Sequence, residues 1–268
     1  MKDVRVAVTI FNSPVGKSSY NIGRMEKWIE NAGENNAAFI CFPELNITGY
    51  TTGKDIINTA EPAKCPNTSL LLDWSAKHNI VILAGMAEKD ITGRIFASHL
   101  IIKPDGDMGI YRKLYLAPPE RSFFTPGNQI PLFETSGIKF GIQLCYDAHF
   151  PELSTHMALN GADIIFIPHA SPRGTPDGKY RSWIRHLKAR AYDNSLFVVA
   201  CNQTGKNQRG LEFPGVGIVI GPSGEITGKD LSGKENMIIA DLKADDLKRV
   251  RNHQMRFFLP NRRPELYT

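Results

Sequence analysis

The chain has 268 residues and a mass of 29.8 kDa, enough to bury a core without disulfide staples, and we expect one domain over residues 1–268. Hydrophobic residues make up 42% and charged residues 22%, which excludes the disordered and collagen-like classes. The net charge of +5 is spread along the chain without a Lys/Arg block, which argues against a nucleic-acid partner and favours an anionic small molecule.

The first third of the sequence alternates strand and helix patterns. Apolar runs over 4–11, 38–42 and 80–86 predict strands, and amphipathic patterns over 20–32 and 69–78 predict helices. The first strand begins almost at residue 1, so we expect no signal peptide. No apolar run approaches the ~18 residues that span a membrane, so we expect no membrane partner.

The middle of the sequence changes to paired strand patterns. They cover 96–103, 109–115, 132–135 and 138–145. The turn Pro104-Asp105-Gly106 joins the first two as a hairpin. A loop rich in proline and glycine, over 117–131, separates the two pairs.

The remainder returns to alternating helices and strands. Helices are predicted over 151–160 and 178–194, and strands over 163–168, 196–201, 216–220 and 237–241. We expect the last two strands on either side of the turn Pro222-Ser223-Gly224-Glu225, followed by a polar tail over 251–268. The order predicts an α/β chain with mixed sheets and no domain linker.

The chain contains four widely spaced cysteines and no CxxC pair, so neither a zinc site nor a redox motif is predicted. They are Cys41, Cys65, Cys145 and Cys201. Without a signal peptide, we expect a reducing cytoplasm, in which free thiols persist.

The strand pattern over 138–145 ends in Cys145, and Phe150-Pro151-Glu152 then opens a helix. A thiol near a helix N-terminus is expected to have a lowered pKa. The backbone N–H groups that follow it, beginning with that of Tyr146, are suitable donors for an oxyanion. A buried core cysteine is the alternative interpretation.

Two charged residues accompany the cysteine. Glu44 follows the strand pattern over 38–42, at the carboxyl edge where open α/β sheets bind ligands, and burial there would raise its pKa. Lys113 shares a strand face with Tyr111 and Tyr115, which favours a partly desolvated cation. A solvated loop glutamate and a solvent-facing lysine are the alternatives. Together, a nucleophile, a base and a cation are what acyl transfer requires.

These motifs together resemble those of the nitrilase superfamily of carbon–nitrogen hydrolases. They are Phe42-Pro43-Glu44-Leu45, Tyr111-Arg112-Lys113, Cys145-Tyr146-Asp147 and Phe150-Pro151-Glu152, in that order. Lys113 follows Glu44 by 69 positions and Cys145 follows Lys113 by 32, which matches the family. The resemblance continues to the tail Arg262-Arg263-Pro264-Glu265-Leu266-Tyr267.

The resemblance implies a four-layer αββα sandwich and a catalytic triad of Glu44, Lys113 and Cys145, without a metal or an organic cofactor. It implies a second glutamate at Glu120, for which a surface carboxylate is the alternative. It also implies a homodimer or a higher homo-oligomer, in which the tail over 251–268 contacts a neighbouring subunit.

Three positions depart from the usual pattern of the family. Tyr115 stands where histidine often follows the lysine motif, Asp193 where glutamate is usual, and Gly217 where serine is common. No member of the triad is affected. The departures concern the shape of the pocket rather than the chemistry.

Several features favour particular substrates. Nitrilases tend to carry Cys-Trp-Glu, whereas Cys145-Tyr146-Asp147 resembles the amidase and carbamoylase branches. We therefore expect a small linear amide or an N-carbamoyl compound, with a nitrile substrate or a non-catalytic binding protein as alternatives. Substrate contacts are expected from Tyr50, His169, Ser171 and Arg173. Arg173 would bind a carboxylate through two hydrogen bonds.

Overall fold

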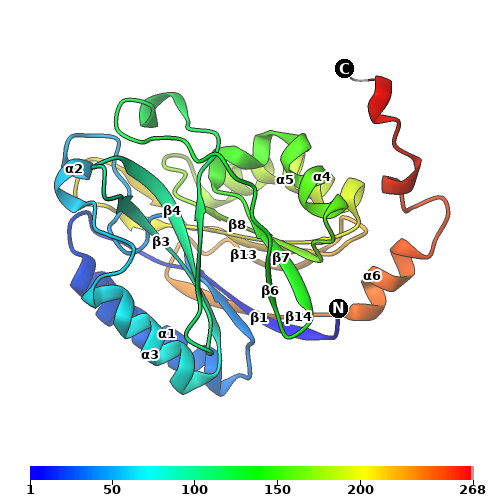
Figure 1. The fold of residues 1–268 in the computed structure, drawn as a ribbon, viewed down its shortest axis with the longest axis horizontal. Helices are drawn as coiled ribbons and strands as arrows, with labels where there is room; N and C mark the ends of the chain where they lie inside the picture. The colour runs from blue at the N-terminus through cyan, green and yellow to red at the C-terminus, as the bar shows by residue number, and fades with distance from the viewer. Residues whose placement is uncertain (267–268) are drawn as a thin grey trace.

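Two six-stranded β-sheets pack face to face at the centre of the molecule (Figure 1). The structure is a computed structural model and describes residues 1–266. Helices α1 (Ser18–Glu34) and α3 (Pro66–His78) cover the outer face of the first sheet. Helices α4 (Pro151–Leu159) and α5 (Pro176–Asn194) cover the outer face of the second sheet. The predicted four-layer αββα sandwich is confirmed.

The first sheet has the strand order β14-β1-β2-β3-β4-β5. Its strands are β1 (Val4–Ile10), β2 (Phe39–Cys41), β3 (Val81–Lys89), β4 (Ile95–Ile102), β5 (Met108–Arg112) and β14 (Asn236–Leu242). Strands β1, β2 and β3 are parallel, and β4 reverses direction before β5 reverses again. The residues that follow β2 and β5, which include Glu44 and Lys113, therefore lie at the same edge of the sheet.

The second sheet has the strand order β13-β12-β9-β8-β7-β6. Its strands are β6 (Phe133–Thr135), β7 (Ile138–Ile142), β8 (Ile164–His169), β9 (Phe197–Asn202), β12 (Gly217–Ile220) and β13 (Ile226–Asp230). Strands β7, β8 and β9 are parallel, so the residues after them share one edge. A parallel bridge between Phe11, after β1, and Gln203, after β9, brings this edge beside the corresponding edge of the first sheet.

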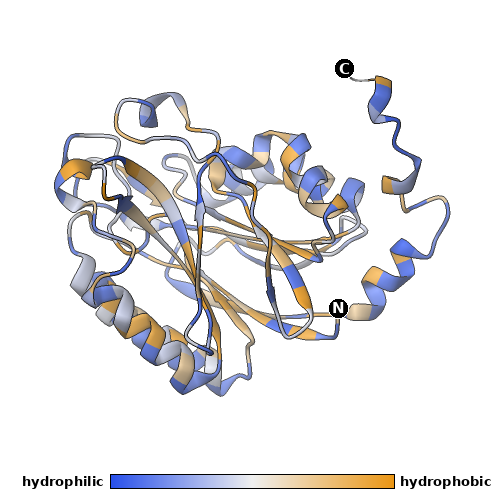
Figure 2. Ribbon diagram, viewed as in Figure 1, coloured by the Kyte–Doolittle hydropathy of each residue, from blue (hydrophilic) through white to orange (hydrophobic). Residues whose placement is uncertain are grey.

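The two sheets are held together by a core of aromatic and branched side chains. Phe39 of β2 lies 5.1 Å from Phe140 of β7 and 5.5 Å from Phe166 of β8, measured between ring centroids. All three are fully buried. Figure 2 shows that the strands of both sheets are largely hydrophobic, while α1 and α3 mix hydrophobic and hydrophilic residues. This packing fixes one sheet edge relative to the other.

The helices follow from amphipathic patterns and from their first residues. In α1, Ile22, Met25 and Ile29 recur at helical spacing and are fully buried. Helix α3 begins at Pro66, three residues earlier than predicted, because Cys65 N donates to Thr68 Oγ1 at 3.0 Å and Pro66 is permitted at the first position. The element boundaries therefore depend on capping contacts rather than on the apolar pattern.

Several predicted elements need correction. The turn over 222–225 joins β12 to β13 and not to the strand near residue 237, which is β14 and pairs with β1 in the other sheet. Strand β13 was missed because it has no apolar run. The short helices α2 (Asp55–Thr59) and α6 (Ala244–Arg251) were also missed; α6 is mostly charged and buries little beyond Leu247 and Val250.

Three smaller features complete the chain. Strands β10 (Thr204–Lys206) and β11 (Glu212–Pro214) form a separate hairpin. After α6 the chain forms an arm with two short 3-10 helices, η3 (Leu259–Asn261) and η4 (Pro264–Leu266) (Figure 1). Phe258 packs against Tyr192 of α5, with 5.5 Å between ring centroids. The last residues of the predicted tail, 267–268, lie outside the described residues. Over residues 1–266, no helix combines the length and the apolar character needed to cross a membrane.

Candidate active site

Three buried charged side chains meet at the edge of the first sheet. Lys113 Nζ donates to Glu44 Oε1 at 2.8 Å and to Glu120 Oε1 at 2.9 Å. Glu44 is 0%, Lys113 1% and Glu120 2% exposed, so water does not screen these charges. Since one ammonium group serves two carboxylates, this dry cluster carries an excess of negative charge when both carboxylates are ionised.

Glu120 lies in η1 (Pro118–Glu120), in the loop that follows Lys113. The alternative of a surface carboxylate is wrong, because the side chain is buried. Its two oxygens also accept hydrogen bonds, from Tyr50 Oη at 2.9 Å and from Ala117 N at 2.8 Å. The structure thus brings Tyr50, selected from sequence as a substrate contact, into the network through Glu120.

Glu44 lies three positions after β2, in a turn that contacts both sheets. Ala170 N, just after β8, donates to Glu44 Oε2 at 2.9 Å. Gln203 Nε2 donates to Glu44 O at 2.7 Å. Gly85 of β3 comes so close that a Cβ added there would lie 2.4 Å from Leu45 N, so only glycine fits. These contacts hold the carboxylate in one orientation toward Lys113.

Lys113 follows directly after β5, and its backbone N donates to Ala97 O at 2.9 Å. Tyr111 and Lys113 are both buried, as predicted for one strand face, and the solvent-facing alternative for the lysine is wrong. Tyr115 was predicted on the same face, but it is 38% exposed and stacks on Phe150 with 3.7 Å between ring centroids. The strand ends before Tyr115, so the alternation of faces ends there too.

Cys145 begins the short helix η2 (Cys145–His149) and is partly buried. Its φ of 44° lies in the left-handed region, which residues other than glycine rarely adopt. The strand predicted to reach Cys145 ends instead at Ile142. A strained backbone of this kind persists only where the surrounding structure imposes it, and such positions cluster at functional sites.

Asp147 ties the turn after β7 to the segment that carries Lys113. Its carboxylate accepts hydrogen bonds from Leu144 N at 2.9 Å, Tyr115 N at 2.8 Å and Tyr111 Oη at 2.7 Å. Asp147 was noted from sequence only as a letter of a motif. Its place two positions after the cysteine could have marked it as a residue of interest, but its link between the two halves of the site depends on long-range hydrogen bonds that the sequence does not show.

Burial governs the protonation of this cluster. Burial raises the pKa of Glu44 from 4.5 to about 7, although Lys113 opposes the shift. Burial lowers the pKa of Lys113, but Glu44 and Glu120 more than reverse this, and the pKa lies well above 10.5. At neutral pH the lysine is therefore charged and Glu44 is near its midpoint.

The thiol of Cys145 behaves differently from the prediction. Burial raises its pKa, the charge of Glu44 adds to the shift, and Lys113 opposes it. The expected lowering of the pKa is wrong, because desolvation and the adjacent carboxylate outweigh the effect of the helix terminus. The thiol is therefore protonated at neutral pH and needs a base to become a nucleophile.

The last residue of β8 and the segment that follows it carry three residues that were expected to contact substrate. The His169 ring is buried and stacks on Trp183 at 3.9 Å between ring centroids, and Nδ1 lies 2.7 Å from Ile167 O. Burial lowers the pKa of His169, so its ring is neutral. Arg173 is exposed. Ser171 is partly buried, between these two.

Lys179 of α5 was not selected from sequence, where it is one of several basic residues in its helix. Its Nζ donates to Ser171 Oγ at 2.8 Å and to Pro172 O at 3.1 Å. Burial lowers the pKa of Lys179, and the thiolate of Cys145 would raise it, so the two groups influence each other. A lysine in the first turn of a helix, where it opposes the helix dipole, is the signal that could have marked it.

An open cavity of about 340 Å³ lies beside the residue that follows Cys145. Its wall is mostly aromatic and aliphatic, with one cation. It is lined by Leu114, Tyr115, Leu116, Arg121, Phe124, Pro126, Tyr146 and Phe150. An apolar wall with few polar groups is typical of small-molecule sites.

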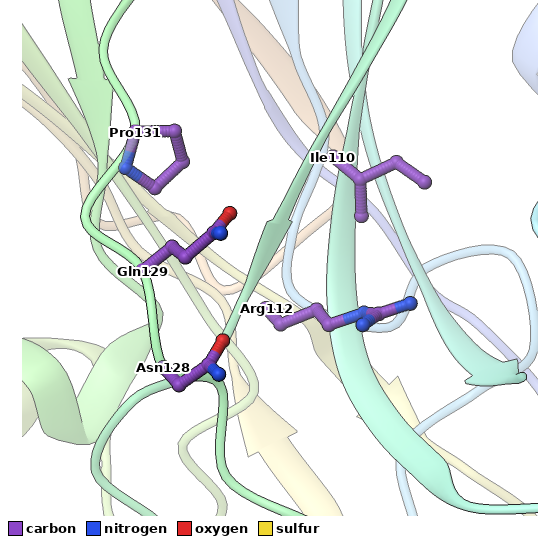
Figure 3. A pocket seen from close by; sticks show the side chains of 5 residues that line it. All are labelled: Ile110, Arg112, Asn128, Gln129 and Pro131. Carbon is purple, nitrogen blue, oxygen red and sulfur yellow. The ribbon is translucent and has the colours of Figure 1, made fainter.

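A second hollow, of about 180 Å³, lies against Ile110 and Arg112 of β5 (Figure 3). Figure 3 shows Arg112 pointing away from Asn128, Gln129 and Pro131, which form the opposite wall. Its guanidinium is already paired with Glu88, at 2.8 and 2.7 Å, so it offers little to a ligand. Neither this hollow nor any other part of residues 1–266 groups three His, Cys, Asp or Glu side chains as a metal site does.

A two-sheet sandwich with helices on both outer faces, and with Glu44, Lys113 and Cys145 at adjacent sheet edges, has the organisation expected of the nitrilase superfamily. The carbon–nitrogen hydrolase family matches residues 5–252, and the chain belongs to that family. The predicted family, and a hydrolase for carbon–nitrogen bonds other than peptide bonds, are thereby confirmed.

Individual relatives cover nearly the whole chain. A probable nitrilase of Schizosaccharomyces pombe is 33% identical over 92% of this chain and 91% of its own. N-carbamoylputrescine amidase of Arabidopsis thaliana is 31% identical over 93% of this chain and 89% of its own. A solved structure from Saccharomyces cerevisiae, a member of branch 10 of the nitrilase superfamily, has a TM-score of 0.84 and 25% identity over 96% of this chain and 97% of its own.

Proposed function

We propose that the protein is a cysteine-dependent amidohydrolase, in which Cys145 attacks a small linear amide or an N-carbamoyl compound and becomes acylated. The observation that carries this proposal is the buried network in which Lys113 joins Glu44 to Glu120, close enough for these charges to shift the pKa of the Cys145 thiol. A base, a cation and a nucleophile in one dry site are the components of acyl transfer.

The reaction begins with proton transfer from the Cys145 thiol to the Glu44 carboxylate. A base with a pKa of about 7 is suited to this step near neutrality. The sulfur then forms a bond to the carbonyl carbon, and the carbonyl oxygen becomes an oxyanion. Lys113 has used two of its three N–H donors on carboxylates, so one remains for the oxyanion, together with the backbone N–H of Tyr146. One such donor is typically worth ~2.7–4 kcal/mol.

The intermediate then collapses. Glu44 returns its proton to the leaving nitrogen, the carbon–nitrogen bond breaks, and ammonia or an amine departs from a thioester on Cys145. Glu44 next takes a proton from water, whose oxygen attacks the thioester carbon, and the released thiolate recovers that proton. Glu120 acts as a positioning residue, because it accepts hydrogen bonds from Lys113 and Tyr50 and touches no reacting atom.

The choice of bond rests on the motif after Cys145 and on the names of two relatives. The amidase name of the Arabidopsis thaliana relative and the Cys145-Tyr146-Asp147 motif favour an amide or N-carbamoyl substrate. The nitrilase name of the Schizosaccharomyces pombe relative supports a nitrile as the second candidate. An amide gives the thioester directly, whereas a nitrile first gives a thioimidate, which must add one water and release ammonia before the same thioester is formed.

The test is ammonia release from matched amides, N-carbamoyl amines and nitriles, measured for the wild type and for Cys145→Ala. We expect Cys145→Ala to release none above background. The control is Cys65→Ser, which replaces a partly buried cysteine at the start of α3 by a good N-cap residue and should retain wild-type rates. Near-native turnover in Cys145→Ala would overturn the proposal. A wild type that hydrolyses only nitriles would exclude the amide and keep the cysteine chemistry.

Two further expectations belong to this proposal. The arm after α6 is largely exposed, which supports its docking on a neighbouring subunit in a homodimer or higher homo-oligomer (Figure 1). The four cysteines, all within the described residues, are free, which supports work in a reducing compartment such as the cytoplasm. Sedimentation of the full chain and of a chain ending at residue 252 would test the first expectation.

A further inference from the structure

Lys179 is held above the edge of the second sheet by the segment that also orients Glu44. Its Nζ donates to Ser171 Oγ at 2.8 Å and to Pro172 O at 3.1 Å. Ala170, which precedes Ser171 in the chain, donates its backbone N–H to Glu44 Oε2 at 2.9 Å. The segment itself is fixed to β9, because Ser171 exchanges two hydrogen bonds with Asn202, at 2.8 and 3.0 Å. The ammonium group therefore has a defined position beside the catalytic cluster.

This cation has no charged partner among residues 1–266. Both of its hydrogen bonds go to neutral oxygens, and no carboxylate lies within ion-pair distance. An ammonium group has three donors, so one N–H is left over. Lys179 is also partly buried and lies in the first turn of α5, where the helix dipole disfavours a cation. Desolvation and the dipole both act against a charge that nothing in the described chain neutralises.

The arginine expected to bind a carboxylate is less suited to that role. Arg173 is exposed, and of its polar groups only the backbone N makes a hydrogen bond within the described residues, to Glu212 O at 2.8 Å. Lys179, in contrast, is partly desolvated and acts electrostatically on the Cys145 thiol. An anion beside Cys145 would interact more strongly with the desolvated cation than with the exposed one.

We propose that Lys179 determines substrate specificity by binding a carboxylate at the end of the substrate away from the bond that is cleaved. The substrates are then short monoamides of dicarboxylic acids, or N-carbamoyl amino acids, rather than neutral amides. The inference rests on the proposed function and deepens it. The negative charge of Glu44 and Glu120 disfavours an anionic substrate, and Lys179 supplies the positive charge that offsets it.

The experiment compares pairs of substrates of similar size that differ in the carboxylate. The pairs are succinamate with butyramide, glutaramate with valeramide, and N-carbamoyl-β-alanine with N-carbamoyl-propylamine. The readout is the ratio of kcat/KM for the charged member to kcat/KM for the neutral member. We expect this ratio to fall by about 100-fold in Lys179→Met, because a charge-assisted pair in a partly buried site is lost. The loss should appear mainly in KM.

Four further variants separate specificity from a structural effect. Lys179→Arg keeps the charge and should recover much of the ratio, and Ser171→Ala should lower it about threefold by loosening one of the two hydrogen bonds. Lys188→Met, at an exposed position of the same helix, should match the wild type. Arg173→Ala should change the ratio by less than about threefold, since exposed charges contribute little.

The outcomes distinguish the two proposals. A wild type that hydrolyses amides without preference for the carboxylate, or a Lys179→Met variant whose ratio stays within threefold of wild type, overturns this inference and leaves the proposed function standing. A ratio that collapses in Arg173→Ala instead assigns the carboxylate to that residue and overturns the inference too. Equal turnover in Cys145→Ala and the wild type overturns the proposed function itself.

Discussion

The two sheet edges that meet at the site are built in different ways. The edge of the first sheet supplies Glu44, Lys113 and Glu120, which are all at most 2% exposed and are hydrogen-bonded to one another and to the backbone. The edge of the second sheet supplies Cys145 and Lys179, which are partly exposed, and Lys179 keeps an unused donor.

The difference separates two tasks. A dry cluster of paired charges is preorganised, and its one remaining donor, on Lys113, suits general acid–base and oxyanion chemistry on any acyl group. An edge that is open and incompletely paired gains most from a ligand, which suits recognition of a particular substrate. Substitution of Glu44, Lys113 or Glu120 should therefore reduce turnover of every substrate, as loss of Cys145 does, whereas substitution of Lys179 should change the choice among substrates.

The largest effect is expected at the centre of the first edge. Lys113→Met leaves Glu44 and Glu120 buried without their common cation, and breaking a buried pair typically costs about 3–5 kcal/mol of unfolding free energy. It also removes an oxyanion donor, so kcat/KM should fall by at least about 1000-fold for charged and neutral amides alike. Urea unfolding and ammonia release measure the two effects.

Lys248→Met is the matched control for that experiment. Lys248 pairs with Asp245 at 3.3 Å, but its side chain is 67% exposed, and such pairs are worth less than about 1 kcal/mol. Its activity should equal that of the wild type. A Lys113→Met variant that kept kcat/KM within tenfold of the wild type would show that the buried cluster is structural and would remove the basis of the comparison.

The next effect concerns Asp147, which joins the two edges. The Asp147 carboxylate accepts three hydrogen bonds, and in Asp147→Asn the side-chain NH2 group would point at one or more of these three donors. Because a buried donor would then lose its acceptor, we expect a loss of about 2–4 kcal/mol in unfolding free energy. Activity should fall about 100-fold, because a small displacement of a reacting group is costly. Tyr111→Phe removes a single donor and should cost about 1 kcal/mol. An equal loss in both variants would contradict a role for the whole carboxylate.

The sequence identified the three charged residues of the first edge. At the second edge it identified Cys145 but not Lys179. Apolar runs and turn residues predict most strands, and parallel strands bring the residues after them to one edge. The position of Glu44 at the sheet edge follows from this rule, whereas Lys113 was placed inside a strand over 109–115 and was identified as a site residue from its neighbours and the motif spacing. Glu120 was identified only through the family resemblance, because a residue in an irregular loop has no periodicity that reveals its burial.

What could not be predicted depends on contacts between segments far apart in the chain. Lys179 and Ser171 meet only because β8 and α5 pack in a particular way, and Asp147 gains its importance from hydrogen bonds that cross between the edges. The pKa of Cys145 was mispredicted for the same reason. Local sequence suggests a helix terminus, whereas desolvation and Glu44, which lies 101 positions earlier, decide the sign.

The smallest expected effect is the gradual pH dependence of kcat/KM that Glu44, at the first edge, produces. Glu44 must be deprotonated to accept the thiol proton, and its pKa is about 7, so kcat/KM should fall about tenfold per pH unit below pH 7. Above pH 7 it should reach a plateau, because the pKa of Lys113 lies well above 10.5. Asp147, whose pKa burial raises to about 6, is the other group that could produce an acid limb.

Asp147→Asn separates the two acids. If Glu44 causes the limb, the residual activity of Asp147→Asn keeps a midpoint near pH 7, whereas loss of the limb would assign it to Asp147. Stability has the opposite sign from activity: because folding raises the pKa of Glu44 from 4.5 to about 7, its contribution to stability is complete below pH 4.5 and is lost as the pH rises through 7. The first edge therefore becomes active over the same pH range in which its buried carboxylate becomes most costly to the fold, and the hydrogen bonds from Lys113 hold that charge in place.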